Sequence, residues 1–108
     1  MRRFARLRRT NEIAFVRRRG LKEAFSTITV FAAEGRGAPR FAITVSKAVG
    51  GAVERNLVRR RIRGALEALG AALPEDRRFV IVARPNASVE PYARLAADVR
   101  RAVGKREE

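Results

Sequence analysis

The segment 52–69, AVERNLVRRRIRGALEAL, holds the side chains best suited to bind an anion. It contains five arginines and, before them, a single acid, Glu54. A guanidinium group binds phosphate through two parallel, charge-assisted hydrogen bonds. In a helix, Arg55, Arg59 and Arg63 fall in one row with about 6 Å between successive residues along the axis. That spacing is similar to the distance between successive phosphates of one strand, so the segment is predicted to bind a nucleic acid.

The same segment is predicted to be a helix because its apolar residues recur with a helical period. The residues that share one apolar sector, which must face a core, are Val58, Ile62, Ala65, Leu66 and Leu69. Asn56 and Arg60 lie beside the arginine row, and an Asn amide can hydrogen-bond a base edge or a ribose hydroxyl. The alternative is an ordinary solvated helix face. The scarcity of acids leaves few internal ion pairs, which favours binding.

The whole chain is strongly basic, with 25 Lys and Arg against 11 Asp and Glu and a net charge of +14 over 108 residues. Because 46% of its residues are hydrophobic, it is too apolar to be a disordered basic tail. Its length fits one domain, 1–108, which starts with a basic N-terminal arm at 1–9. An anionic partner would offset the self-repulsion of this charge, and nucleic acid is the first candidate.

Several kinds of chemistry are excluded by residues that the chain lacks. It has no Cys and no His, which rules out thiol nucleophiles, disulfides and imidazole catalysis. Its carboxylates are scattered, whereas a nuclease that holds Mg²⁺ itself brings several together. We therefore expect no catalytic residue, metal site or bound cofactor in the protein. The N-terminus lacks the apolar stretch of a secretion signal, and no segment reaches about 18 apolar residues, so a cytoplasmic location without membrane contact is expected.

The remaining pattern predicts an α+β domain with the element order α-β-β-α-β-α. Thr10 is expected to cap the first helix and Gly20 to end it. The strands on either side of the turn 34–39 are expected to pair as a hairpin. Residues 1–5 and 104–108 are expected to fray. The predicted elements are helix 10–19, strand 21–33, strand 40–47, helix 52–69, strand 78–85 and a last helix from Pro91 to about Val103.

The stretch from Phe41 to Leu66 resembles the bacterial ribonuclease P protein component. In that family a strand ending in VSK is followed by a Gly-containing turn and by a helix with the pattern AVxRNxxKRxIR. Arg59 stands where the family usually has Lys. The matching residues are Val45, Ser46, Lys47, Gly50, Ala52, Val53, Arg55, Asn56, Arg60, Ile62 and Arg63. Further matches, which extend the resemblance over residues 6–103, are Arg6, Leu7, Gly20 and the segment 80–85, VIVARP.

The resemblance implies a fold and a function. The fold is an α-β-β-α-β-α sandwich, a ribosomal-protein-like domain with a left-handed βαβ crossover through the central helix, against the usual right-handed rule. Members of the family bind a large catalytic RNA and the 5′ leader of precursor tRNA, and the RNA hydrolyses the phosphodiester with Mg²⁺. The chain would thus be the protein subunit of an endoribonuclease, favour Mg²⁺ binding by the RNA, and need no obligate protein partner.

The resemblance also implies two sets of site residues. The Arg-Asn helix faces the catalytic RNA, and the matching residues are Lys47, Arg55, Asn56, Arg59, Arg60 and Arg63. The leader lies between the first helix and one face of the sheet, and the matching residues are Ile13, Arg17, Thr29, Phe31 and Thr44. Phe31 is suited to stack on a base, a contact that tolerates any sequence, but it fits a core position equally well.

The chain departs from the family pattern at two places. Leu57 replaces the last residue of the family's Arg-Asn-Arg, so one phosphate contact is either lost or supplied by Arg61. Ile13 and Arg17 occupy the positions of two aromatic residues on the first helix, and the nearby Phe15 falls on a different face. Either charge holds the leader there, or the helix start is shifted and Phe15 takes the aromatic role.

Two other functions fit a basic chain of this size. The first is a structural ribosomal-type RNA-binding protein that has no role in processing. The second is a protein nuclease that acts alone, which would require RNA-free protein to cut the substrate. The VSK and Arg-Asn motifs favour the ribonuclease P subunit over the structural protein.

Overall fold

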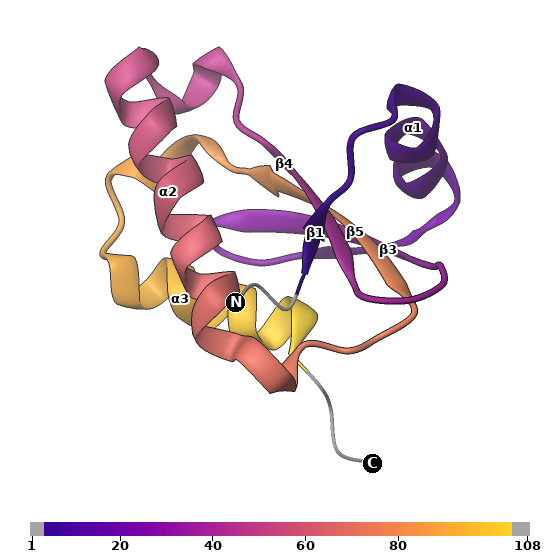
Figure 1. The fold of residues 1–108 in the computed structure, drawn as a ribbon. Helices are drawn as coiled ribbons and strands as arrows, with labels where there is room; N and C mark the ends of the chain where they lie inside the picture. Colours follow the sequence, from indigo (N-terminus) through magenta and orange to yellow (C-terminus); the bar gives the residue numbers. More distant parts are fainter. Residues whose placement is uncertain (1–3, 105–108) are drawn as a thin grey trace.

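A computed structural model describes residues 4–104 of the protein. A five-stranded sheet, with strand order β1-β4-β5-β3-β2, separates α1 from α2 and α3 (Figure 1). The α+β sandwich expected from the sequence is therefore confirmed. The elements are β1 (Ala5–Arg6), α1 (Thr10–Arg19), β2 (Leu21–Ala24), β3 (Ile28–Glu34), β4 (Arg40–Thr44), η1 (Lys47–Val49), α2 (Ala52–Leu69), η2 (Gly70–Ala72), β5 (Arg77–Ala83), η3 (Pro85–Ser88) and α3 (Tyr92–Val103), where η marks a 3-10 helix.

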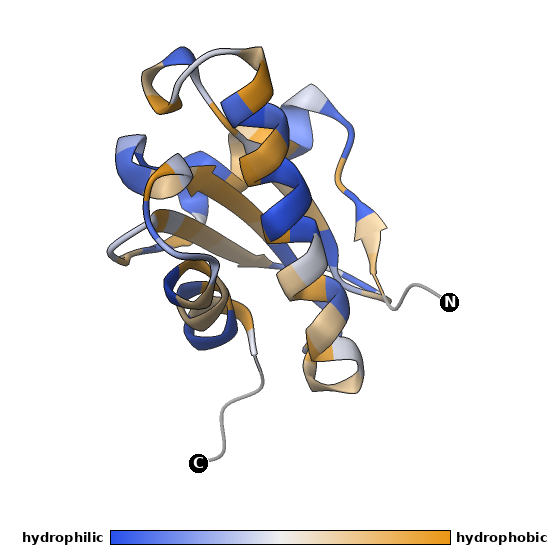
Figure 2. Cartoon of the chain, turned by 90° about the vertical axis from the view of Figure 1, so that its left-hand side faces the viewer, coloured by the Kyte–Doolittle hydropathy of each residue, from blue (hydrophilic) through white to orange (hydrophobic). Residues whose placement is uncertain are grey.

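The larger core lies between the sheet and the pair α2 and α3. Alternate residues of the three central strands point to this side, among them the buried Val30 and Ile81. The rings of Phe41 and Phe79 stack here, with centroids 4.8 Å apart. The predicted apolar sector of α2 also faces this core: its buried members are Val58, Ile62, Ala65 and Leu66. Figure 2 shows α2 and α3 in front of the hydrophobic strands, with the most hydrophilic turns of α2 near its middle.

A smaller apolar cluster joins α1 to the opposite face of the sheet. Its buried members are Leu7, Val16, Phe31, Ala42 and Val80. Val80 belongs to this cluster and its neighbour Ile81 to the larger core, because successive strand residues face opposite sides. Both have 0% exposure. The strand β5 is thus buried on both faces, which is why it lies in the middle of the sheet.

The helix ends are set mainly by glycine. The N–H of Gly20 donates to the carbonyl of Val16 at 2.8 Å and ends α1 as predicted. At the start of α2, the N–H of Gly51 donates to Oε1 of Glu54 at 2.8 Å. Gly70 ends α2 with φ of 48°, a conformation that favours glycine. The predicted cap at Thr10 is wrong: Arg9 takes the capping position, and no side chain caps α1.

The predicted hairpin between the strands 21–33 and 40–47 is also wrong. The strand β3 pairs with β2 and β5, both antiparallel, whereas β4 pairs with β1 and β5, both parallel. The late strand β5 therefore separates β3 from β4. Because α2 joins the parallel neighbours β4 and β5, it is the crossover connection. The left-handedness that the resemblance implies for this crossover stays a prediction.

The single strand predicted over 21–33 is in fact two strands. The chain turns at Ser26 and Thr27, where the N–H of Phe25 donates to the carbonyl of Ile28 at 2.8 Å. All four residues of β2 are exposed at the sheet edge. The β-favouring composition of the segment is shared by both strands, so composition alone did not mark the turn.

The N-terminal arm is partly built into the sheet. Ala5 and Arg6 form β1, and the N–H of Leu7 donates to the carbonyl of Phe41 at 2.8 Å. Leu7 is only 2% exposed. The expected fraying is wrong for Ala5 and for Gly104, whose N–H donates to the carbonyl of Arg100 at 2.9 Å. Residues 1–3 and 105–108 lie outside the described residues.

Candidate nucleic-acid interface

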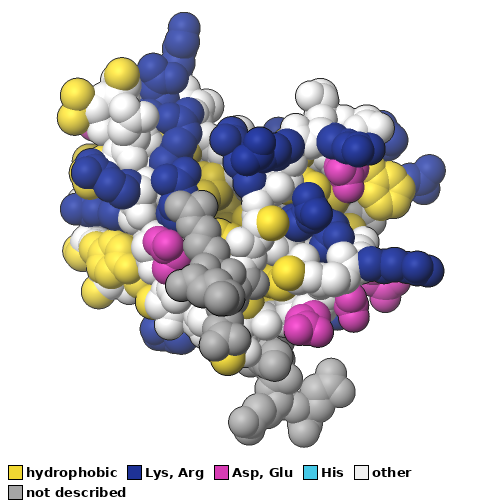
Figure 3. All heavy atoms as spheres, viewed as in Figure 1, with side chains coloured by type: hydrophobic (Ala, Val, Ile, Leu, Met, Phe, Trp, Pro, Cys, Tyr) yellow, Lys and Arg dark blue, Asp and Glu magenta, His cyan; other side chains and the backbone are white. Residues whose placement is uncertain are grey.

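The predicted arginine row lies along one flank of α2. Arg55 and Arg59 are half-buried, and Arg63 is exposed. The opposite flank of α2 faces α3, since Tyr92 lies beside Gly64 there. Figure 3 shows Lys and Arg side chains gathered along α2 and over the surface between α2 and α1. The row therefore belongs to a basic surface that extends beyond its own helix.

The other candidate residues at α2 are also accessible. Asn56, Arg60 and Lys47 are exposed, and Lys47 lies in η1, just before the start of α2. The Nη1 atom of Arg59 donates to Oδ1 of Asn56 at 3.2 Å, which leaves the amide N–H groups of Asn56 free to donate to another partner. Leu57 and Arg61 are both half-buried, and the replacement of the missing phosphate contact by Arg61 stays a prediction.

Arg55 has an unusual environment for a surface arginine. Its Nε atom is buried and has no hydrogen-bond partner within residues 4–104. A buried donor without an acceptor costs about 1–3 kcal/mol. The described part of the chain therefore leaves this donor of the arginine row unsatisfied.

A groove of about 340 Å³ runs between α1, β4 and the segment after β1. Two of the residues predicted to contact the leader, Ile13 and Thr44, line it together with Arg6 and Arg8. The two arginines were not among the predicted site residues. The strand β1, which contains Arg6 and ends two residues before Arg8, is too short to show an alternating pattern, although the run of basic residues around Leu7 indicated the charge.

Thr29 lies on the same face of the sheet as Thr44. It pairs with Val82 of β5, and Val82 pairs with Thr44 of β4, so the three residues form one row across three strands. Two strand spacings separate the threonines by roughly 10 Å. The structure thus gathers Ile13, Thr29 and Thr44 around the face of the sheet that α1 covers.

Phe31 lies beneath α1 and is 9% exposed. The guanidinium of Arg17 lies 5.4 Å from the centroid of its ring, and Nζ of Lys22 lies 5.9 Å from it. Cations at these distances are attracted to the ring face. The burial agrees with the alternative that Phe31 is a core residue, and its stacking on a base stays a prediction.

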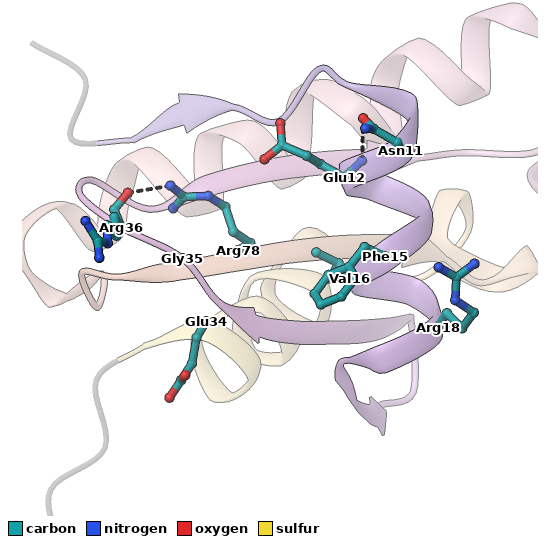
Figure 4. Close-up of a pocket in the computed structure, with 9 residues that line it drawn as sticks. All are labelled: Asn11, Glu12, Phe15, Val16, Arg18, Glu34, Gly35, Arg36 and Arg78. Carbon is teal, nitrogen blue, oxygen red and sulfur yellow. Dashed lines mark hydrogen bonds between the residues drawn. The ribbon is translucent and has the colours of Figure 1, made fainter.

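Phe15 is separated from the other predicted leader residues. It is 50% exposed and borders a different cavity, which it shares with Glu34 and Arg78 (Figure 4). Ile13 and Arg17 instead face the sheet, where Ile13 packs on the smaller cluster and Arg17 covers Phe31. The helix α1 thus presents aliphatic and cationic groups on the sheet side and its aromatic residue on the outer flank.

The described part of the chain contains no group of residues that could hold a metal ion and no helix that could span a membrane. Within residues 4–104, no three His, Cys, Asp or Glu residues form a group that could hold a metal ion. No helix in the same range has the length and hydrophobicity to cross a membrane.

The chain is similar to known proteins over almost its whole length. The family model described as Ribonuclease P matches residues 1–107. The ribonuclease P protein component of Acidothermus cellulolyticus is 38% identical over 103 residues, which cover 93% of this chain and 86% of that protein. The component of Streptomyces avermitilis is 38% identical over 104 residues, covering 87% and 85%.

Solved structures share the fold at lower identity. The RNase P protein from Thermotoga maritima in complex with 1-(4-fluorophenyl)-2-thiourea superposes with a TM-score of 0.84 at 19% identity and covers 94% of this chain and 100% of that one. A Staphylococcus aureus RNase P protein, a mutant with defective mRNA degradation activity, gives a TM-score of 0.82 at 20% identity, covering 90% and 86%. At these identities the likeness concerns the fold alone.

Proposed function

The chain belongs to the ribonuclease P protein family, and from this premise we propose that it assists a catalytic RNA in removing the 5′ leader from precursor tRNA. The family assignment favours this function over that of a structural ribosomal-type protein. The single observation that carries the residue-level proposal is the arginine row on α2, which lies within the motif that the family resemblance rests on. We expect the protein to act in the cytoplasm with its RNA partner.

The surface of α2 is the proposed contact with the catalytic RNA. Arg55, Arg59 and Arg63 would each bind a phosphate along one strand, and Asn56 would donate to a base or ribose beside them. The remaining proposed contacts on this surface are Arg60 and Lys47.

The groove between α1 and β4 is the proposed path of the leader. Arg6 and Arg8 on its rim would hold the phosphates, while Ile13 and Thr44 would contact bases and riboses. Of the two alternatives for α1, the position of Arg17 over Phe31 supports a leader held mainly by charge. Phe15, on the outer flank, is too far around the helix to replace the missing aromatics in this groove.

The proposed division of labour leaves hydrolysis to the RNA. The Mg²⁺ that the reaction needs would be bound by RNA phosphates, and the protein would lower the repulsion between those phosphates with its own cations. The protein would therefore contribute positioning and electrostatic screening, and none of its residues is assigned to the catalytic step.

Reconstitution tests this proposal. The protein is mixed with a bacterial ribonuclease P RNA at low Mg²⁺, and the cleavage rate of precursor tRNA is compared with that of the RNA alone. We expect strong stimulation at low Mg²⁺ that fades as Mg²⁺ rises. A rate equal to that of the RNA alone would overturn the proposal, and cleavage by RNA-free protein would assign the chemistry to the protein instead.

A further inference from the structure

The outer flank of α1 borders a second cavity that the proposed function does not use. It measures about 500 Å³ and lies between α1 and the turn that follows β3 (Figure 4). This volume falls within the roughly 300–1,000 Å³ typical of small-molecule sites. It is large enough for one nucleotide.

Phe15 supplies an apolar wall for this cavity. Half of its surface is exposed, and it belongs to neither apolar cluster, although its neighbour Val16 is buried in the smaller one. Figure 4 shows the ring projecting from the side of α1 toward Arg78. An exposed ring of this kind contributes little to folding, but it offers a flat face for a base.

Arg78 forms the opposite side of the cavity and is held in place by the protein backbone. Its Nη1 atom donates to the carbonyl of Arg77 at 2.9 Å and to that of Ala38 at 3.3 Å. Its Nη2 atom donates to the carbonyl of Arg36. Within residues 4–104, no carboxylate forms an ion pair with Arg78. The charge is thus positioned but not neutralised.

Gly35 makes this arrangement possible. A Cβ atom at this position would lie 2.6 Å from Cγ of Arg78 and 2.7 Å from its Nε, closer than packed atoms approach. Any other residue would push Arg78 away from the turn. The sequence and the backbone therefore agree in keeping a cation at this side of the cavity, opposite Phe15.

We infer that this cavity is a second site for single-stranded RNA, in which one unpaired nucleotide stacks its base on Phe15 and directs its phosphate to Arg36 and Arg78. Both arginines line the cavity, where Arg36 is exposed and Arg78 is half-buried. Unpaired bases are commonly recognised by an aromatic face together with polar groups at their edges. The inference rests on the proposed function, because it takes the partner to be RNA.

The two carboxylates that line the cavity, those of Glu12 and Glu34, favour a neutral base over an acidic peptide. Glu34 also lines the cavity, and a carboxylate accepts hydrogen bonds from the amino groups of bases. The same carboxylate would repel an acidic peptide. With the leader groove on the sheet side of α1 and this cavity on its outer flank, the helix lies between two single-strand sites.

The absence of cysteine from the chain allows a clean crosslinking test. Arg18→Cys carries a photocrosslinker at the cavity, and Thr44→Cys carries the same reagent at the leader groove. Each labelled protein is reconstituted with catalytic RNA and precursor tRNA, and the crosslinked nucleotides are mapped on both RNAs. We expect Arg18→Cys to crosslink unpaired nucleotides different from those reached by Thr44→Cys. The same nucleotides from both positions, or none from Arg18→Cys, would overturn the inference.

Binding of a short unpaired RNA to the free protein tests the stacking contact. Phe15→Ala should weaken the affinity roughly 5- to 150-fold, the loss of one base–aromatic stack, whereas Phe15→Tyr should retain it. Val89→Ala removes an apolar side chain elsewhere that is even more exposed, at 81% against 50% for Phe15, and should change nothing. Unchanged affinity for Phe15→Ala, or competition by an acidic peptide as strong as by RNA, would contradict the second site.

The two proposals fail in different experiments. If the unmodified protein stimulates precursor tRNA cleavage but Phe15→Ala binds RNA normally, the second site is wrong and the proposed function stands. If the unmodified protein gives no stimulation, the proposed function is wrong, and the effect of Phe15→Ala on RNA affinity still decides whether the cavity binds RNA.

Discussion

The carboxylate of Asp98 accepts two hydrogen bonds from Thr27, a residue 71 positions earlier in the chain. Its Oδ2 atom lies 2.9 Å from the backbone nitrogen of Thr27 and 2.5 Å from its Oγ1. Both residues are buried, with exposures of 5% and 0%. The pair joins α3 to the turn between β2 and β3, and it explains why the chain turns at that point rather than continuing as one strand.

Asp98→Ala should destabilise the protein by about 3 kcal/mol, because it leaves two buried donors of Thr27 without an acceptor. Chemical denaturation measures the change. Asp98→Asn keeps an acceptor oxygen and should lose less. Equal stability of Asp98→Ala and the unmodified protein would show that the turn does not depend on this pair.

Two glycines should respond to alanine in opposite directions. A Cβ at Gly20 would lie 2.5 Å from the carbonyl oxygen of Val16 and 2.7 Å from that of Ala32, so Gly20→Ala should lower the melting temperature. A Cβ at Gly64 would meet only the hydroxyl of Tyr92, at 4.0 Å. Gly64→Ala should stabilise α2 by about 0.5–1 kcal/mol. Thermal unfolding of both variants checks the prediction, and a shift of the same sign in both would contradict it.

The arginine row should govern the salt dependence of assembly. Arg59→Ala combined with Arg63→Ala should weaken binding to the catalytic RNA and reduce the slope of log K against log salt by roughly 0.7–0.9 per lost phosphate contact. The control is Arg94→Ala combined with Arg100→Ala, which removes the same charge from α3. Equal slopes for the two double variants would place the RNA away from α2.

Phe31→Leu should separate the leader contact from the packing role of this residue. Leucine keeps most of the apolar volume but loses the ring beneath Arg17, so affinity for precursor tRNA should fall roughly fivefold or more while affinity for mature tRNA stays the same. Phe79→Leu makes the same change on the opposite face of the sheet and should affect stability alone. If both variants bind precursor tRNA equally well, Phe31 is only a core residue.

The local pattern of the sequence predicted α2 well and the sheet less well. The bounds 52–69 agree with the structure because apolar residues with a helical period lie between Gly51, which precedes the helix, and Gly70, which ends it. The position of β5 depends on its burial on both faces, a property of the assembled sheet. The turn at Thr27 depends on Asp98, and the strand β1 on its pairing with β4. These are long-range contacts, which no short window of sequence contains.

Part of the candidate site could likewise be predicted from the local sequence pattern, and part of it could not. The arginine row follows from helical periodicity, so the amino-acid sequence alone is enough to identify it. The groove residues Arg6 and Arg8, and the cavity between Phe15 and Arg78, bring together segments far apart in the chain. The sequence shows that these residues are present, but it does not show which of them lie together in the folded chain.

The central place of β5 also has a consequence for synthesis. The chain makes β3 and β4 first, yet these strands do not pair with each other, and the strand that joins them follows only after α2 is complete. Contacts between distant segments form slowly compared with local ones. A nascent chain that ends before residue 77 should therefore lack a stable sheet, and α2 should have no fixed surface to pack on. The RNA would thus meet an ordered α2 only after the last third of the protein has left the ribosome.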